Sequence, residues 1–133
     1  MGYGDLSDED ERIGMLIVDA AFHVHRELGP GLLEHVYEVC FCHELTRRGL
    51  KAERQVKLPI TYDGIIFEDA LRLDVLVEDL VICELKSAET GADLFRAQLL
   101  TQLRFSGKHL GYLINFNVPL LKKGIQRIVR SGQ

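Results

Sequence analysis

Charged side chains interrupt two otherwise apolar, strand-like segments of this sequence. Asp74 lies within the run 71–77, and the run 80–85 contains Glu84 and is followed directly by Lys86. A core strand rarely buries a charge without a partner, so these residues must meet one another or a ligand. Few pairings of the two strands allow such a meeting. This requirement limits the fold more than any other feature of the chain.

The register of the hairpin between these strands decides whether the charges meet. Glu84 and Lys86 are two residues apart and therefore share a face of their strand. A two-residue turn at Glu78-Asp79 would point Asp74 away from Glu84, because a shift of one residue moves a side chain to the other face. A three-residue loop over 78–80 would pair residue 74 with residue 84, and a one-residue bulge would act similarly. A shared site requires one of these two geometries.

This charged group has two chemical interpretations. Two neighbouring carboxylates repel each other, and a hard cation such as Mg²⁺ or Mn²⁺ relieves the repulsion through oxygen ligands. Such a cation activates water at a scissile phosphate, and a nearby lysine stabilises the transition-state anion. The alternative is a structural cluster in which Lys86 neutralises Asp74 and Arg72 pairs with Glu84. The residues alone leave both interpretations open.

The hydrophobic periodicity predicts the remaining elements of one α+β domain over residues 1–133, with helices packed on a sheet. Helical spacing predicts helices over 8–28, 32–48 and 92–105, the first capped by Ser7 and Asp10. Alternation predicts strands over 52–62, 71–77, 80–85 and 110–116. A turn at Asp63-Gly64 returns through 65–67, and 126–129 form a last strand or a short helix. We expect residues 1–7 to be flexible.

The composition argues against several classes of protein. Hydrophobic residues make up 47% of the chain and charged residues 27%, as in globular domains. The longest apolar runs fall far short of the roughly 20 residues of a membrane span, and the acidic N-terminus is unlike a secretory signal. The 3 cysteines lie in apolar stretches, which indicates reduced thiols. We therefore expect a cytoplasmic protein with no membrane partner.

The charge distribution bears on nucleic-acid binding. A net charge of -4 argues against binding through bulk charge. From residue 104 to the C-terminus, however, the chain has no acid and includes Lys122, Lys123 and Arg127. We expect these residues to flank the charged site and contact phosphates, whereas the alternative is a solvated basic face.

Two helical segments place further polar residues near the same strands. Glu34 stands among apolar neighbours in Gly31-Leu-Leu-Glu34-His-Val-Tyr37, so we expect its carboxylate to approach the sheet. Gln98 and Gln102 lie one helical turn apart, on the helix that follows the lysine-bearing strand.

These blocks together resemble the bacterial GxxExxY protein family, a branch of the PD-(D/E)XK nuclease superfamily. The similarity extends from about residue 13 to residue 130 and includes, in order, Gly31-x-x-Glu34-x-x-Tyr37, Arg72-Leu-Asp74-Val-Leu-Val-Glu-Asp, Glu84-Leu-Lys86 and Ala97-Gln98. The resemblance implies an αβββαβ core with an additional N-terminal helix. It also implies metal ligation by Asp74 and Glu84, with the carbonyl of Leu85 and the carboxylate of Glu34 as further ligands.

The resemblance extends to catalytic residues and to function. Lys86 matches the motif lysine, Glu34 the accessory helical acid, and Gln98 the glutamine of exonuclease-like branches. Leu73 replaces the motif proline, and Gln102 stands where the pattern has an aromatic residue. The implied function is a Mg²⁺- or Mn²⁺-dependent nuclease acting on DNA or RNA. The alternative is a non-catalytic module that binds nucleic acid or a protein partner, and the small, acidic chain favours help from such a partner or from a second copy.

Overall fold

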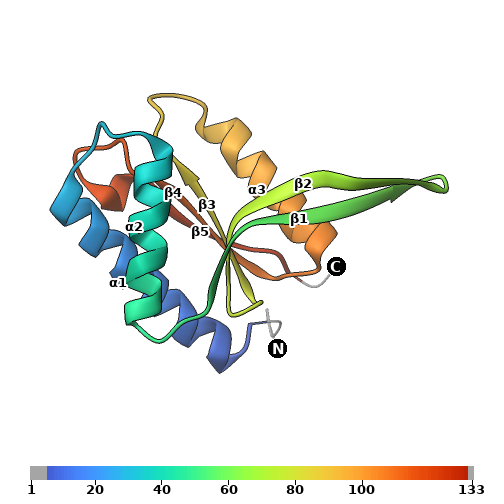
Figure 1. Cartoon of the computed structure of the whole chain (residues 1–133), viewed down its shortest axis with the longest axis horizontal. Helices are drawn as coiled ribbons and strands as arrows, with labels where there is room; N and C mark the ends of the chain where they lie inside the picture. The colour runs from blue at the N-terminus through green and yellow to red at the C-terminus, as the bar shows by residue number, and fades with distance from the viewer. Residues whose placement is uncertain (1–5, 132–133) are drawn as a thin grey trace.

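A computed structural model describes residues 6–131 and shows a five-stranded sheet in the order β1-β2-β3-β4-β5 (Figure 1). The strands are β1 (Ala52–Tyr62), β2 (Ile65–Val77), β3 (Val81–Lys86), β4 (Leu110–Asn115) and β5 (Ile125–Val129). The helices are α1 (Asp8–Leu28), α2 (Glu34–Arg47), α3 (Ala92–Ser106) and the 3₁₀ turn η1 (Leu121–Lys123). Strands β3 and β4 run parallel and are connected by α3, whereas the other neighbouring strands are antiparallel. The α+β fold class is confirmed.

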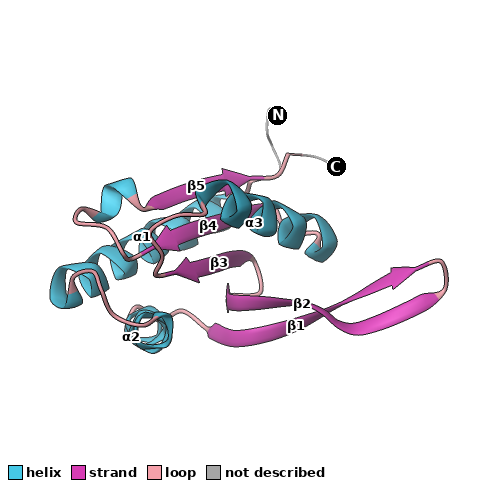
Figure 2. Cartoon of the chain, turned by 90° about the horizontal axis from the view of Figure 1, so that it is seen from above, coloured by secondary structure: helices cyan, strands magenta, loops and turns pink. Residues whose placement is uncertain are grey.

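Helices cover both faces of the sheet, with α1 and α2 on one face and α3 on the other (Figure 2). Side chains of β3 alternate between two hydrophobic cores. Cys83 and Leu85 lie in the core under α1 and α2, whereas Ile82 lies in the core under α3. Glu84 and Lys86 share the face of Ile82 and therefore point towards α3. No helix in the described part of the chain is long and apolar enough to cross a membrane.

The capping box that the sequence predicts at the start of α1 is confirmed. The Asp10 N–H donates to Ser7 Oγ at 3.0 Å, and the Ser7 N–H donates to Asp10 Oδ2 at 3.1 Å. A cap of this kind stabilises a helix by about 1 kcal/mol. Within the segment expected to be flexible, residues 1–5 lie outside the described residues, Leu6 packs against the larger core and Ser7 caps α1.

Some element boundaries differ from the sequence prediction. The separate strands expected over 65–67 and 71–77 form one continuous β2, because β1 pairs with it from Tyr62↔Ile65 to Ala52↔Val77. Helix α2 begins at Glu34 rather than at residue 32. The last element is a strand, and η1 and β5 therefore extend the expected αβββαβ core.

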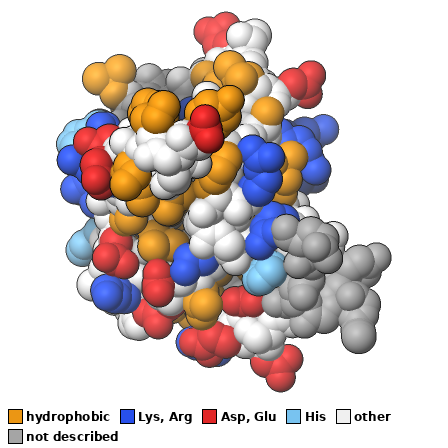
Figure 3. Space-filling view, turned by 90° about the vertical axis from the view of Figure 1, so that its right-hand side faces the viewer, with side chains coloured by type: hydrophobic (Ala, Val, Ile, Leu, Met, Phe, Trp, Pro, Cys, Tyr) orange, Lys and Arg blue, Asp and Glu red, His pale blue; other side chains and the backbone are white. Residues whose placement is uncertain are grey.

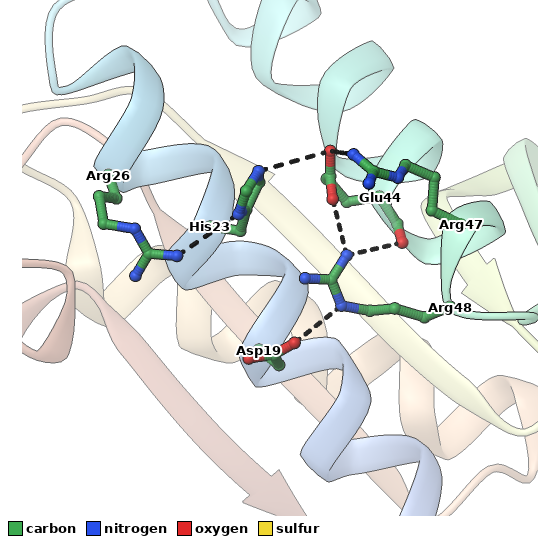
Figure 4. Close-up of polar contacts among 6 residues, drawn as sticks. All are labelled: Asp19, His23, Arg26, Glu44, Arg47 and Arg48. Carbon is green, nitrogen blue, oxygen red and sulfur yellow. Dashed lines mark hydrogen bonds and ion pairs between the residues drawn. The ribbon is translucent and has the colours of Figure 1, made fainter.

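A network of charged side chains connects α1 with α2 (Figure 4). Arg48 donates to Asp19 Oδ2 at 2.8 Å and to Glu44 Oε1 at 2.7 Å, while His23 and Arg47 approach Glu44 Oε2 at 3.8 and 3.6 Å. The hydrogen bond from Arg48 lowers the pKa of Glu44 below its ordinary value. The network fixes the C-terminal end of α2 against α1.

The variant Glu44→Gln tests this network, because it keeps the shape of the side chain and removes its charge. We expect a loss of about 1 kcal/mol in the free energy of unfolding at pH 7, measured by urea denaturation, since the buried Glu44 carboxylate pairs with the partly exposed His23 and the exposed Arg47, where solvent screens the interaction. The folded-state pKa of Glu44 is lowered, so its contribution is present above the ordinary pKa of 4.5 and is lost as the pH falls through the folded-state value. Equal stability of the two proteins at pH 7 would contradict this assignment.

Candidate functional site

The β2–β3 hairpin has the register that a shared site requires. Val77 pairs with Val81, which leaves residues 78–80 as the connecting loop. Glu78 and Asp79 adopt left-handed conformations with φ of 54° and 57°. The predicted three-residue spacing is therefore confirmed, and continuing the same register beyond the paired residues brings residue 74 opposite residue 84.

Asp74 lies where β2 separates from β3. The ladder between these strands ends at Val75, and the N–H of Leu85 donates instead to Asp74 Oδ2 at 2.9 Å. On the other side of β2, Gln55 of β1 has a φ of 55° and interrupts the β1–β2 ladder opposite Asp74. Burial raises the pKa of Asp74, the bond from Leu85 lowers it, and the nearby carboxylate of Glu38 raises it further. A half-buried acid is thus held at an opening in the sheet.

Glu84 is the acid at the base of this opening, with 5% of its surface exposed. Gln102 Nε2 donates to Glu84 Oε1 at 3.2 Å, and Lys86 Nζ lies 3.5 Å from Glu84 Oε2. Burial raises the pKa of Glu84 to about 7, and repulsion from Asp74 adds to the rise, while Lys86 and Gln102 oppose it. Near neutral pH, this site contains a carboxylate whose charge the protein compensates only in part.

Lys86 is held at the end of β3 by contacts from α3 and β4. Its ammonium lies 4.6 Å from the centroid of the Phe95 ring, a distance at which a cation is attracted to an aromatic face. Asn115 pairs with Lys86 across the parallel ladder and bonds both the N–H and the carbonyl of Ala88, at 3.1 and 2.8 Å. The lysine therefore has a fixed position beside Glu84.

The loop before α2 is attached to the same end of β3. Gly31 adopts a φ of 100°, which favours glycine, and the Tyr37 hydroxyl accepts the N–H of Leu32 at 3.1 Å. The Tyr37 ring stacks on Phe116 with a centroid separation of 4.5 Å. Ser87 Oγ donates to the carbonyl of Leu32 at 2.6 Å. The glycine and tyrosine of the Gly31-x-x-Glu34-x-x-Tyr37 segment thus shape and anchor the loop that precedes the glutamate.

Glu34 is the first residue of α2, and its side chain remains exposed at the rim of the site. Partial burial raises its pKa, Asp74 raises it further, and Lys86 lowers it. Glu34 thus interacts electrostatically with the group, although no hydrogen bond joins it to these residues in the described structure. That its carboxylate joins the group as a ligand stays a prediction.

A cleft of about 430 Å³ opens over Glu84 and Lys86, between β2 and α3. The β2 wall consists of Ala70, Leu71 and Arg72, and the α3 wall consists of Leu94, Ala97, Gln98, Thr101 and Gln102. Gln102, rather than Gln98, contacts Glu84. Both glutamines have a buried Oε1 without a hydrogen-bond partner among the described residues. The spacing of four residues placed both on one face of α3, but it did not indicate which of them reaches the acid.

The salt-bridge alternative does not form as drawn from the sequence, and one expectation for the basic residues is wrong. Lys86 pairs with Glu84 rather than Asp74, and Arg72 lines the cleft without an ion pair among the described residues, so the salt-bridge cluster imagined from the sequence does not form. The C-terminal basic residues do not line the cleft either. Arg127 points to the α1 face and donates to Glu11 at 3.0 Å, and η1, which contains Lys122 and Lys123, packs beside α1.

The donor set suits Mg²⁺ or Mn²⁺ bound partly by water and substrate. No group of three or more His, Cys, Asp or Glu side chains among residues 6–131 is arranged to hold a metal ion. Mg²⁺, however, is usually bound by one or two carboxylates together with waters and phosphate oxygens. Asp74 and Glu84 provide two carboxylates with raised pKa values, and a hard dication would relieve their repulsion. The residues present therefore fit such an ion.

The mixed sheet, the helices on both of its faces and the acids and lysine at the β2–β3 opening define a nuclease-like α+β protein. A family model described as the PD-(D/E)XK nuclease superfamily matches residues 11–128, and the chain belongs to this superfamily. Its members generally use divalent metals. A comparison with curated proteins and a comparison with solved structures each found no match.

The raised pKa values predict an unusual dependence of stability on pH. A folded-state pKa of about 7 for Glu84, against an ordinary 4.5, means that the folded protein keeps a proton that the unfolded chain releases. Stability from this group is complete below pH 4.5 and is lost as the pH rises through about 7, by on the order of 3 kcal/mol. We expect the melting temperature in chelating buffer to fall over this range, and Glu84→Gln to reduce the fall. A flat profile for both proteins would refute the shift.

Proposed function

We propose that the chain is a metal-dependent nuclease that hydrolyses phosphodiester bonds of DNA or RNA, acting as a single domain of the GxxExxY family. The observation that supports this most is the repulsion between two carboxylates, Asp74 and Glu84, with Glu84 and Lys86 lining an open cleft. A fold gains no stability from repelling buried carboxylates, whereas a cation site requires them. Support for the family comes from the Gly31 to Tyr37 loop and its attachment to β3.

Each side chain has a proposed role. Asp74, Glu84 and the carbonyl of Leu85 would hold the cation, with Glu34 as a further ligand at the rim. When bound, Mg²⁺ or Mn²⁺ activates water and neutralises charge at the phosphate. Lys86 orients the nucleophile or stabilises the developing anion.

The glutamines and Arg72 complete the proposed substrate site. Gln102 fixes the orientation of Glu84 through its hydrogen bond, and Gln98 contacts substrate from the α3 wall. The exposed guanidinium of Arg72 binds a phosphate next to the scissile one, because it lines the cleft and has no acid partner among the described residues.

A second candidate function is a non-catalytic module that binds nucleic acid or a protein partner. The observation in its favour is that Glu84 already has a lysine at 3.5 Å and a glutamine at 3.2 Å, so a purely structural role would satisfy part of its charge. Removing either member of such a buried pair would leave an unpaired charge and cost about 3–5 kcal/mol. Stability measurements therefore separate the two functions.

Glu84→Gln and Lys86→Ala test the nuclease directly. In Mg²⁺ or Mn²⁺, we expect the wild type to cut single- or double-stranded DNA or RNA slowly, and both variants to lose activity by orders of magnitude. Above pH 7.5, Glu84→Gln should be as stable as the wild type or more stable, because it removes a buried charge. Mg²⁺ should raise the melting temperature of the wild type and of Lys86→Ala, but not that of Glu84→Gln.

The matched control is Glu44→Gln, which removes a buried acid on the opposite face of the sheet. It should lose stability and retain cutting, which shows that inactivity of the site variants is not a consequence of weakened folding. A wild type without cutting on any of these substrates, together with variants destabilised by several kcal/mol, would support the structural role instead.

Arg72→Gln tests substrate binding separately from chemistry. We expect KM for an oligonucleotide to rise by roughly tenfold with little change in kcat, since the residue contacts a phosphate away from the reacting atoms. The plot of log affinity against log salt concentration should become less steep, by the amount that one phosphate contact contributes to the slope. Leu120→Gln, at an exposed position away from the cleft, is the control and should change neither quantity. An unchanged KM and salt slope for Arg72→Gln would remove Arg72 from the binding site.

A further inference from the structure

Asp74 lies at a gap in the strand pairing on both sides of β2. On one side, the pairing of β2 with β3 ends at Val75, so residue 74 lies beyond the last pair. On the other side, the β1–β2 register contains the pairs before and after position 55 but omits the pair of Gln55 with Asp74. Backbone bonds to two neighbouring strands usually fix a residue inside a sheet. The position of Asp74 therefore depends on side-chain contacts, of which the bond from the Leu85 N–H is one.

Gln55 has a backbone conformation that glutamine rarely adopts. Its φ is 55°, in the left-handed region, although the residue lies inside β1. A residue with a Cβ atom is strained in this region, and the strain persists only where the surrounding structure imposes it. Strained residues of this kind gather at functional sites. Gln55 lies directly opposite a proposed metal ligand, so we looked for the contact that holds it.

Glu38 provides that contact from α2, one helical turn after Glu34. Gln55 Nε2 donates to Glu38 Oε1 at 2.9 Å, and Arg54 Nε donates to Glu38 Oε2 at 2.8 Å. Glu38 is 5% exposed, so water competes little for its oxygens. A hydrogen bond to an ionised acceptor is roughly twice as strong as a bond between neutral groups. The bond to Glu38 therefore offsets the backbone strain of Gln55.

Packing alone does not require this network. Replacing a buried charged pair with apolar side chains of similar volume is often neutral or stabilising. A residue with extended backbone at position 55 would also complete the ladder between β1 and β2. The chain instead keeps a buried acid and a strained residue, and both lie beside Asp74, whose pKa the Glu38 carboxylate raises.

We propose that Glu38 is a positioning residue for Asp74 and acts through Gln55. By holding Gln55 in the left-handed conformation, Glu38 keeps the β1–β2 ladder open at residue 74. The Asp74 carboxylate is then placed against β3, where it accepts the N–H of Leu85. The role of Asp74 as a metal ligand rests on the proposed nuclease function, whereas its position against Leu85 is measurable without any metal.

Two variants of Gln55 separate the backbone conformation from the side-chain bond. Gln55→Ala loses the bond to Glu38 and keeps the strain, so we expect the ladder to close at this position. Gln55→Gly loses the same bond, but glycine adopts a positive φ without strain and the opening should persist. The readout is hydrogen exchange of the Leu85 amide in the metal-free protein, measured by NMR. We expect exchange about tenfold faster in Gln55→Ala and close to the wild-type rate in Gln55→Gly.

Calorimetric titration with Mn²⁺ alone gives a second readout. Residues that orient a metal ligand typically change metal affinity by about 10–100-fold when they are replaced. We expect the Kd for Mn²⁺ to rise at least about tenfold in Gln55→Ala and to change little in Gln55→Gly. A wild type that binds no Mn²⁺ would contradict the nuclease function. In that case, faster exchange of the Leu85 amide in Gln55→Ala alone would still support the positioning role.

Glu38→Met tests whether Glu38 acts through Gln55, because methionine keeps the length of the side chain and removes the acceptor. We expect it to speed exchange of the Leu85 amide in the wild-type background. In the Gln55→Gly background it should have no effect, since no bond to Gln55 remains to be lost. If Glu38→Met does not fold, Glu38→Gln replaces it and should speed exchange several-fold in the wild-type background alone, since it weakens the bond by removing the charge.

Asp63→Ala is the matched control for a left-handed residue. Asp63 has a φ of 49° in the turn at the outer end of the β1–β2 ribbon (Figure 1), on the side of the molecule that Figure 3 shows. Alanine is strained there as it is at position 55, so some stability should be lost. Exchange of the Leu85 amide and the Kd for Mn²⁺ should stay at their wild-type values.

Three results would overturn the positioning role. The first is an unchanged exchange rate of the Leu85 amide in Gln55→Ala. The second is exchange in Gln55→Gly as fast as in Gln55→Ala, which would mean that the backbone conformation is not the cause. The third is an equal effect of the Glu38 variant with and without Gln55→Gly.

Discussion

The hydrogen bond from the N–H of Leu85 to Asp74 Oδ2 marks the point where β2 separates from β3, and the candidate site lies at this point. Strand β2 pairs with β3 up to Val75 and then leaves it, and the carboxylate takes the place of a strand carbonyl. A cleft lies between β2 and α3 near this point, and the hairpin register places the acid opposite Glu84. The separation also leaves the outer ribbon without a third strand. The outer β1–β2 ribbon thus begins where β2 leaves β3.

The two faces of the sheet contain buried charges of different kinds. Beside α1 and α2, Glu44 is surrounded by Arg48, Arg47 and His23, and its pKa is lowered. Beside α3, burial and the neighbouring carboxylate of Asp74 raise the pKa of Glu84, and Lys86 opposes this rise. Opposite charges stabilise the ionised form of a buried acid, and like charges destabilise it. The sign of the shift thus distinguishes the network between α1 and α2 from the acid pair for which a cation site is proposed.

Much of this fold is predictable from the sequence, because hydrophobic periodicity predicts the helices and most strands. The parity of residues 74, 84 and 86 restricts a shared site to a three-residue hairpin loop or a bulge. The continuity of β2 was not predictable, since Glu68 and Asp69 resemble turn residues. They lie at a register shift of the β1–β2 ladder, between the pairs Ile60↔Phe67 and Leu58↔Leu71. Which of the two glutamines, Gln98 or Gln102, contacts Glu84 depends on the rotation of α3 about its axis. Arg127 lies on the α1 side of the sheet because it bonds to Glu11, 116 residues earlier in the chain. Local sequence patterns cannot predict a contact between residues so far apart.

The sequence separation of the site residues has a consequence for the order in which the site forms. Asp74 and Glu84 belong to one hairpin, and contacts between near neighbours in sequence close quickly because little chain entropy is lost. The parallel pairing of β3 with β4, the arrival of α3 with Gln102 and the docking of the loop before Glu34 all require distant segments. The two like charges therefore meet while water still surrounds them, and desolvation comes with the later tertiary contacts. The repulsion grows during folding, and the last segments to dock do so against it.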